Sequence, residues 1–425
     1  MTESFLHYLW QFQYFDKKEL KTTSGELVQV LHPGMRNTHA GPDFSDAKIK
    51  IGALEWRGSV EIHIAASGWM EHHHDDDAAY EKVVLHVVWE NDKPVVRSDG
   101  SPMPTLELKN RVDISLWNKF KKLLTSSESI PCASSWSRVN EVVKLSMLDR
   151  VLAQRLKAKA GIVLSMLDKN QNDWEETAYQ LLCKNFGFKV NTDSFLRLAE
   201  TIPFKILRKH INNTKQVEAL LFGQAGFLEK VAKDEYSNLL KREYSLLTTK
   251  YKLSDKQLHQ SQWRFLRLRP ANFPTIRLAQ LAALLIQNQS IFSSIIDTVA
   301  FEELYKRLAV KQSAYWQTHY QFGKPVQRVP YLGKSSVKNL IINTAIPVLV
   351  AYGIRQDDQR YMERALDWLQ HLPAEKNTII RQWSGLGLTI KTAFDSQALI
   401  ELYNNYCLKR RCLDCTIGTS LVKPS

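Results

Sequence analysis

Residues 41–64, GPDFSDAKIKIGALEWRGSVEIHI, have the pattern of two β-strands joined by a short turn. Charged and apolar residues alternate over Asp46–Ile51, and a longer β-rich run covers Glu55–Ile64. Gly52 and Ala53 reverse the chain between the two runs. We therefore expect the two strands to pair as a hairpin.

The segments around this hairpin extend it into a small α/β domain, which we place at residues 1–112. Its expected order is a helix, three strands, a connector or short helix, and a strand, with one further strand possible at the end. The expected segments are a helix over 5–12, strands over 26–31, 46–51, 55–64 and 83–89, a connector over 71–80, and a last strand over 105–108.

The chain becomes helical in pattern after Ile114. Apolar residues recur there at steps of three and four, as in Val142, Leu145, Leu148, Leu152 and Leu156. The Ser-rich stretch within 113–137 is expected to be a linker, and 138–425 a basic helical domain with a Cys-containing tail. The fold class expected is α+β, with an α/β domain followed by a larger, mostly α-helical domain.

Composition sets the class of protein and the kind of partner. The chain has 425 residues, of which 44% are hydrophobic and 24% charged, as in globular proteins. Its net charge of +13 is uneven, because residues 1–105 carry 10 Lys and Arg against 16 Asp and Glu, and the remainder carries 47 against 28. The front also holds eight of the twelve His. An acidic, His-rich front and a basic back suggest a cation site carried by a part that binds a polyanion such as nucleic acid.

No apolar run approaches the roughly 20 residues that span a bilayer, and the candidate at 341–352 is interrupted by Asn343 and Pro347. The start has Glu3 and lacks the basic region of a signal peptide. We expect no membrane partner and a cytoplasmic location. Five unevenly spaced Cys favour reduced thiols or a metal cluster over a disulfide framework.

Acidic and histidine side chains gather around the hairpin. Alternate residues of a strand share a face, so Glu61 and His63 should project together while Val60, Ile62 and Ile64 enter the core. Such a pattern places two functional side chains on one exposed face.

Asp43 precedes the first strand and should therefore meet Glu61 at one end of the hairpin. Two neighbouring carboxylates repel each other unless a cation lies between them, and hard oxygen ligands suit Mg²⁺ or Mn²⁺. We predict a metal site at Asp43 and Glu61, with His74 and Asp77 as further ligands. His86 lies in an apolar strand, where a histidine satisfied in the core is the more common case.

Ordinary structural roles are the alternative for the same residues. Asp43 would then cap a turn, Glu61 would pair with Arg57 or Lys48, and His72–His74 would form a solvated loop.

Pro42-Asp43, an 18-residue gap and Glu61-x-His63 on a strand resemble the PD-(D/E)xK nuclease superfamily. The resemblance implies a restriction-endonuclease-like domain in which Asp43, Glu61 and His63 are catalytic. His63 stands where that motif has Lys, whose role is to position or activate the attacking water. An imidazole there would take over that role or become a metal ligand.

Over its whole length the chain is more specifically similar to a family of uncharacterised bacterial proteins. The matching stretches are GPDF at 41–44, GSVEIH at 58–63, the segment 69–88 and RLRPANFP at 267–274. This second resemblance implies no established activity.

Two further clusters lie in the basic part. Arg264, Arg267, Arg269 and Arg277 are candidate phosphate ligands, with nearby aromatic residues to stack on bases. The alternative is a structural network in which the arginines bridge helices.

Cys407, Cys412 and Cys415 have the spacing of the first three ligands of plant-type ferredoxins. They are candidate ligands of a terminal Fe–S cluster or zinc ion, for which Cys132, Cys183 or a His would have to supply the fourth ligand. Because no fourth ligand is local, we expect thiols without a metal.

These features together predict a metal-dependent phosphodiesterase, a nuclease acting on nucleic acid. One alternative is a nuclease-like protein that binds nucleic acid or acts as a scaffold without catalysis. A second is a zinc-dependent hydrolase built from His63, His72, His74 and His86.

Overall fold

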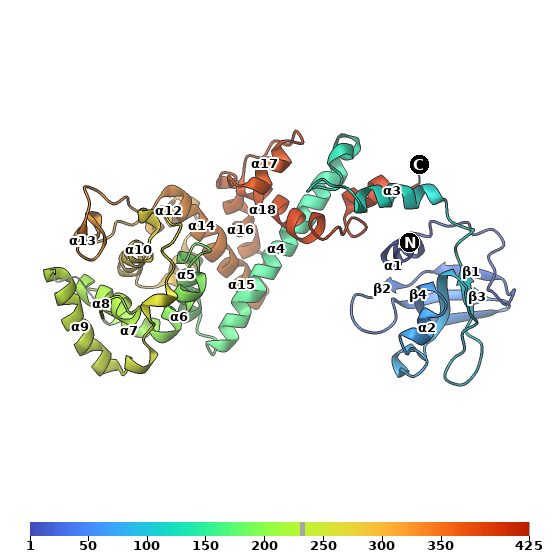
Figure 1. Cartoon of the computed structure of the whole chain (residues 1–425), viewed down its shortest axis with the longest axis horizontal. Helices are drawn as coiled ribbons and strands as arrows, with labels where there is room; N and C mark the ends of the chain where they lie inside the picture. Colours follow the sequence, from blue (N-terminus) through green and yellow to red (C-terminus); the bar gives the residue numbers. More distant parts are fainter. Residues whose placement is uncertain (230–233, 425) are drawn as a thin grey trace. The chain divides into compact units, whose positions relative to one another are not determined.

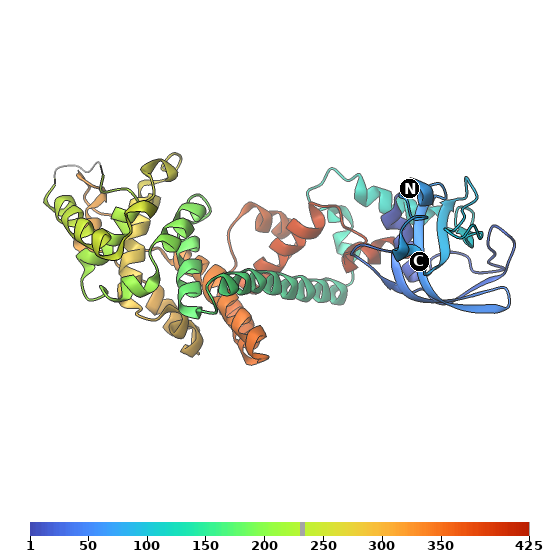
Figure 2. The same ribbon diagram turned by 90° about the horizontal axis from the view of Figure 1, so that it is seen from below.

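The computed structural model describes residues 1–229 and 234–424, and these form two compact units (Figures 1 and 2). The N-terminal unit contains Met1–Arg150, Gly385–Gly387 and the C-terminal segment from Leu399. The helical unit contains Val151–Ser384 and Leu388–Ala398. The molecule is thus a mixed α/β protein with a sheet in one unit and helices in the other.

The sheet of the N-terminal unit has the strand order β1-β3-β4-β5-β6, and the short β2 pairs with β3. β1, β3 and β4 are antiparallel neighbours, whereas β5 and β6 run parallel to β4. The strands are β1 Val28–His32, β2 Met35–Arg36, β3 Phe44–Ile51, β4 Leu54–Ala65, β5 Val83–Glu90 and β6 Thr105–Glu107. All the expected strands form, at slightly shifted bounds.

The expected hairpin is confirmed as β3 and β4. Ile51 pairs with Leu54 across a turn in which Gly52 has a φ of +60°, a region that glycine enters without strain. At the other end Phe44 pairs with Val60, so Asp43 arrives beside Glu61.

β4 departs from simple alternation in its second half. The four residues from Val60 to His63 are all buried, so both faces of the strand are covered there. Helix α1, Glu3–Phe12, packs on β4, and the turn that contains α2, Gly68–Glu71, lies against His63. Ile64, expected in the core, is 39% exposed, because it is next to the end of the strand.

The expected linker at 113–137 is largely helical and belongs to the N-terminal unit. It contains α3, Ile114–Leu124, and the 3-10 helix η2, Ala133–Arg138. Phe120 of α3 stacks on Phe5 at 5.6 Å, and the C-terminal helix α19, Thr416–Val422, contacts α3. The serine content suggested a linker, but the apolar residues between the serines are buried. The N-terminal unit therefore extends past residue 112 and includes the C-terminal segment.

The helical unit begins at Val151, within the long helix α4, Glu141–Lys169, which Figure 2 shows clearly. Its helices are α5 Trp174–Phe186, α6 Thr192–Thr201, α7 Phe204–Arg208, α8 Thr214–Gln224, α9 Glu235–Tyr251, α10 Pro274–Gln287, α11 Ile291–Asp297, α12 Phe301–Leu308, α13 Ala314–Gln317, α14 Lys334–Leu340, α15 Ile346–Gln356, α16 Arg360–His371, α17 Thr378–Ser384 and α18 Ala393–Leu402. A small hairpin of β7, His319–Gln321, and β8, Lys324–Pro325, interrupts them.

The segment Lys334–Gln356 is long and apolar enough, by length and composition, to cross a membrane. It joins α14 and α15 through a π-helical turn, Ile341–Ala345. Within its most apolar window 72% of the residues are buried inside the structure, as in a helix of a protein core.

Candidate metal site

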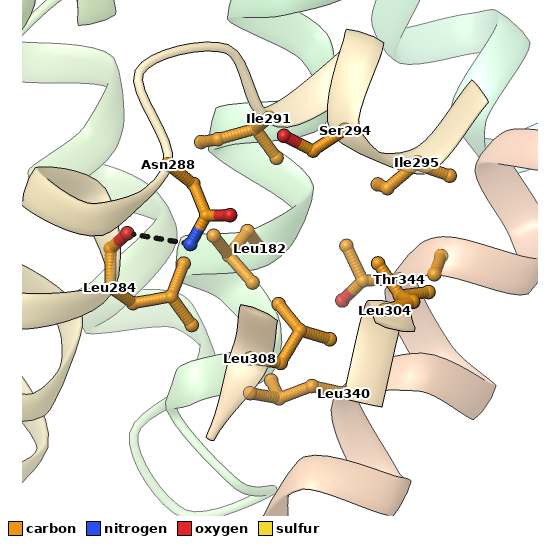
Figure 3. A pocket seen from close by; sticks show the side chains of 11 residues that line it. Leu182, Leu284, Asn288, Ile291, Ser294, Ile295, Leu304, Leu308, Leu340 and Thr344 are labelled. Atoms are coloured by element: carbon orange, nitrogen blue, oxygen red, sulfur yellow. Dashed lines mark hydrogen bonds between the residues drawn. The ribbon is translucent and has the colours of Figure 1, made fainter. Parts of the chain in front are cut away.

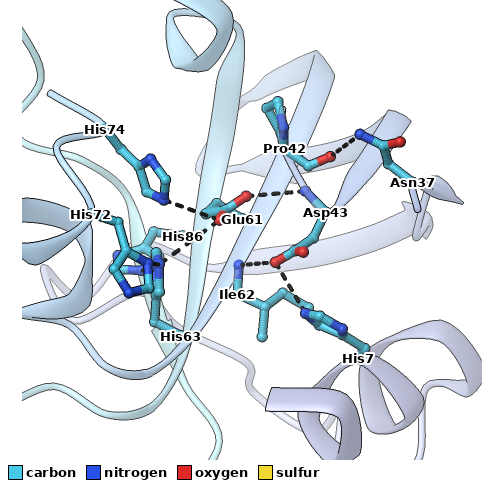
Figure 4. Close-up of polar contacts among 10 residues, drawn as sticks. All are labelled: His7, Asn37, Pro42, Asp43, Glu61, Ile62, His63, His72, His74 and His86. Carbon is cyan, nitrogen blue, oxygen red and sulfur yellow. Dashed lines mark hydrogen bonds and ion pairs between the residues drawn. The ribbon is translucent and has the colours of Figure 1, made fainter. Parts of the chain in front are cut away.

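The two carboxylates of the predicted site meet at the end of the β3–β4 hairpin (Figure 4). The Asp43 N–H donates to Glu61 Oε2 at 3.0 Å, and the Ile62 N–H donates to Asp43 Oδ2 at 3.1 Å. The Asn37 side chain donates to the Pro42 carbonyl at 3.1 Å, which holds the loop before β3. Backbone pairing thus fixes the position of both acids.

Three histidines converge on the same place. His63 Nε2 lies 3.2 Å from His72 Nδ1, and His74 Nε2 lies 3.4 Å from Glu61 Oε1 (Figure 4). One ring nitrogen from each of His63, His72 and His74 falls within 4.8 Å of the others, a spacing that allows them to hold one ion.

His63 is held from both sides. Its Nδ1 lies 2.9 Å from Nε2 of His86, so the second nitrogen of the candidate ligand has the kind of partner that orients metal-bound histidines. A Cβ on Gly68 would come within 2.9 Å of His63 Cδ2, so the turn can approach β4 this closely because residue 68 is glycine.

The site is buried rather than open to solvent, contrary to the expected exposed face. Glu61 is 6% exposed and His63 is 2% exposed. Burial, and next the charge of Asp43, raise the pKa of Glu61 to about 8. Burial and the neighbouring histidines lower the pKa of His63 to about 3, and burial, followed by the charge of His74, lowers that of His86 to about 3. Neutral imidazole is the form that binds metals, and a cation would favour the charged form of Glu61.

The ordinary roles considered for these residues are not the ones found. Arg57 pairs with Asp46 at 3.2 Å, whereas Glu61 faces His74. Of the three consecutive histidines, His72 and His73 are exposed and His74 is half-buried, and ring nitrogens of His72 and His74 reach the group around His63.

Sequence reasoning missed His7 on α1, whose Nε2 lies 3.1 Å from Asp43 Oδ2 (Figure 4). Glu3 lies one turn earlier on the same helix, and its charge also acts on Glu61. The i, i+4 spacing of Glu3 and His7 places them on one helix face and was the available signal.

Asp77, predicted as a ligand, has another role. Its Oδ1 accepts a hydrogen bond from the Ala79 N–H at 2.9 Å and caps the 3-10 helix η1, Ala78–Tyr80. It lines a neighbouring acidic pocket of about 500 Å³ together with His74 and Arg97. Tyr80 stacks on His74 at 3.8 Å and fixes that ring. The negative charge of Asp77 therefore acts on His74 from the neighbouring pocket. Asp77 is not part of the group formed by His63, His72 and His74.

The predicted arginine cluster divides in two. Arg264, Arg267 and Arg269 are exposed, as phosphate ligands must be. Arg277 is buried, donates to Asn272 Oδ1 at 2.7 Å, and lies over the ring of Phe188.

Burial lowers the pKa of the Arg277 guanidinium to about 10. Trp263, expected to stack on bases, is 4% exposed and donates to the Ala225 carbonyl. Arg277 and Trp263 therefore have structural roles, as the alternative interpretation of this cluster expected. The partners of Arg277 are an amide and an aromatic ring, where carboxylates were expected.

The N-terminal unit also has a basic groove of about 700 Å³ that sequence reasoning did not identify. Its cationic side chains come from α3, η2 and the C-terminal end, which are distant in sequence: Lys119, Lys122, Arg138 and Lys423.

The helical unit holds a small apolar cavity next to Asn288 (Figure 3). Its volume of about 20 Å³ has room for about one water molecule. It is too small for a nucleotide or another substrate of comparable size.

The cysteines are all in the described part of the chain, and all five are free thiols. Cys407, Cys412 and Cys415 are buried in the N-terminal unit, as is Cys132. Cys183 lies in α5 of the helical unit.

The fold and the site define a mixed α/β protein with a buried carboxylate and histidine cluster suited to a divalent cation. The chain belongs to the DUF2851 family, described as "Protein of unknown function (DUF2851)", whose model matches residues 3–378. No curated protein and no solved structure matches the chain. The expected membership of an uncharacterised family is confirmed, and the comparisons leave the nuclease resemblance without support.

Proposed function

We propose that the N-terminal unit is a metal-dependent phosphodiesterase that acts on nucleic acid. The observation that carries the proposal is the convergence of Asp43 and Glu61, from adjacent strands, with the ring nitrogens of His63, His72 and His74. A helix followed by three antiparallel strands and a parallel fourth is also the order that the PD-(D/E)xK resemblance implies.

In this proposal Glu61, His63, His72 and His74 hold a divalent ion, with His86 orienting His63. When bound, such an ion acidifies water and neutralises charge on a phosphate. The nitrogen-rich set shifts the preference from Mg²⁺ toward Mn²⁺ or Zn²⁺. His63 then serves as a ligand rather than as the substitute for the Lys that activates water.

Asp43 is the remaining acid of the site, and it contacts His7 at 3.1 Å. Its carboxylate is 24% exposed, the more accessible of the two acids, so it is the group placed to accept a proton from the attacking water. The His7 imidazole would position that carboxylate.

The test is cleavage of plasmid, single-stranded DNA and RNA by the full chain with Mg²⁺, Mn²⁺, Zn²⁺ or EDTA. We expect cleavage that EDTA abolishes and that falls by about 10²-fold or more in Asp43→Ala and Glu61→Gln. Glu55→Gln is the matched control, because Glu55 is an exposed acid on the same strand. No cleavage under any metal, with retained gel shifts, would select the non-catalytic binding protein instead.

The three-histidine group favours a second candidate, a zinc-dependent hydrolase acting on another substrate. Stoichiometric zinc in the purified chain, lost in His72→Ala, combined with no cleavage of nucleic acid, would select it.

A further inference from the structure

Four of the five cysteines come together in the N-terminal unit, although the sequence separates one of them from the others by about 275 positions. Cys132 is the N-cap of η2, and Cys407 ends the π-helical turn Tyr403–Cys407. Cys412 follows in the next turn, and Cys415 is the N-cap of α19. Each is only 7–8% exposed.

Hydrogen bonds from Arg410 hold these segments against one another. The Arg410 guanidinium, between Cys407 and Cys412, donates to the Ser126 carbonyl at 2.8 Å and to the Glu128 carbonyl at 3.0 Å. These contacts tie the C-terminal cysteines to the segment that leads into Cys132.

A glycine and an ion pair hold the loop that contains Cys412 and Cys415. A Cβ on Gly418 would lie 2.1 Å from the Cys412 carbonyl oxygen, so the first turn of α19 can pack on the cysteine loop because residue 418 is glycine. Asp414, between Cys412 and Cys415, pairs with Arg36 of β2 at 2.8 Å. The loop is therefore joined to the sheet as well as to the segment before Cys132.

The buried thiols need a shared positive group to become thiolates, because burial raises the pKa of Cys132 and of Cys412 to about 12. Cys412 and Cys415 act electrostatically on Cys132, and all three of these act on Cys407. Arg410 and Arg150 act in the opposite direction, and the N–H groups of Ile417 and Gly418 donate to Cys415. Hydrogen bonds to sulfur of this kind are typical of iron–sulfur sites.

The positions of the sulfurs are compatible with a cluster. Within residues 1–229 and 234–424, His63, His72 and His74 form the group whose ligand atoms all lie within 4.8 Å of one another, and no three of the cysteines form such a group. A zinc ion with Zn–S bonds of about 2.3 Å holds its ligands closer than that. An iron–sulfur cluster places several atoms between its ligands and accepts a wider set.

We propose that Cys132, Cys407, Cys412 and Cys415 ligate an iron–sulfur cluster that fastens the C-terminal segment to the N-terminal unit. Cys132 supplies the fourth ligand that the C-terminal spacing lacks, which replaces the expectation of thiols without a metal. Cys183 is excluded by its position in the helical unit. The proposal does not depend on the phosphodiesterase.

The experiment is anaerobic purification of the full chain, followed by iron and acid-labile sulfide analysis and by EPR after reduction. We expect iron and sulfide in equal amounts, about two or about four of each per chain, and a brown protein with broad absorption at about 400 nm. In Cys132→Ser and Cys412→Ser the iron content should fall to less than about one per chain. Cys183→Ser is the matched control, a buried cysteine whose loss should leave iron unchanged.

Three outcomes would overturn the proposal. They are a wild-type chain that takes up no iron even after anaerobic reconstitution, stoichiometric zinc that depends on these four cysteines, and wild-type iron content in Cys132→Ser. Because the first is measured on the wild-type chain, the test stands even if a serine variant fails to fold.

Discussion

At the scale of single residues, Glu61 is a carboxyl group placed where water hardly reaches. Its partners are the Asp43 N–H and the His74 ring. Because the group is buried, the protonated carboxyl is more stable there than the charged carboxylate, and its pKa is raised. Burial also lowers the pKa of His63 and of His74. In the proposed metal site, a divalent cation would supply the positive charge that favours the charged form of Glu61.

Metal affinity should consequently depend on pH through Glu61. With a pKa of about 8, this carboxyl binds a proton at lower pH that the metal must displace, whereas His63, with a pKa of about 3, stays neutral. We expect the affinity for Mn²⁺ to rise by about fivefold from pH 7 to pH 8 and by about a further twofold at higher pH. Isothermal titration calorimetry measures this, with Glu55→Gln as control. An affinity that is flat over this interval would contradict the assignment of Glu61.

At the scale of elements, the turn after β4 decides the geometry of the site. β4 presents His63, but His72 and His74 reach it because α2 starts at Gly68 and packs directly on that ring. The strands supply a fixed platform, and the short helical turn supplies the remaining ligands. Packing of this turn should therefore be as important to the site as the ligands themselves.

Gly68→Ala tests this packing. The added methyl group would meet a buried ring held by His72 and His86, so we expect a loss of about 1–3 kcal/mol in the free energy of unfolding. Gly161→Ala is the control, because Gly161 lies in α4 with open space around its Cα, and alanine there should raise stability by up to about 1 kcal/mol. Urea denaturation compares the two variants. Equal stability of both would show that the turn does not pack as described.

At the scale of the whole molecule, charge is distributed unequally along the chain. The part after Thr105 has a net charge of +19, and its exposed arginines include Arg264, Arg267 and Arg269. Each phosphate neutralised by a cationic side chain releases a counterion, so binding to nucleic acid through this part should weaken steeply with salt.

We expect the slope of log K against log salt on duplex DNA to become less steep by about 2 to 3 when Arg264, Arg267 and Arg269 are all changed to alanine. The matched control replaces three other exposed arginines of the helical unit, Arg208, Arg242 and Arg360, and changes the net charge equally. Fluorescence anisotropy in EDTA separates binding from cleavage. Equal slopes for the two triple variants would show that net charge alone, and not these three arginines, sets the salt dependence. Binding that does not depend on salt would contradict the prediction that this part of the chain contacts phosphates.

The sequence by itself determined the hairpin and the meeting of Asp43 with Glu61. Both follow from local rules, because period-two alternation and a two-residue turn fix which residues oppose each other in adjacent strands. The nearly continuous apolar run of β5 likewise identified a strand buried on both faces.

Only the tertiary structure decided which distant residues join these sites. His7 reaches Asp43 from a separate helix, His72 and His74 reach His63 from the turn after β4, and Cys132 lies with Cys407 and its neighbours. Periodicity along a segment specifies the face of a helix or strand that is buried, but not the element that covers it. That choice depends on how complementary surfaces pack across the whole N-terminal unit, which no local pattern encodes.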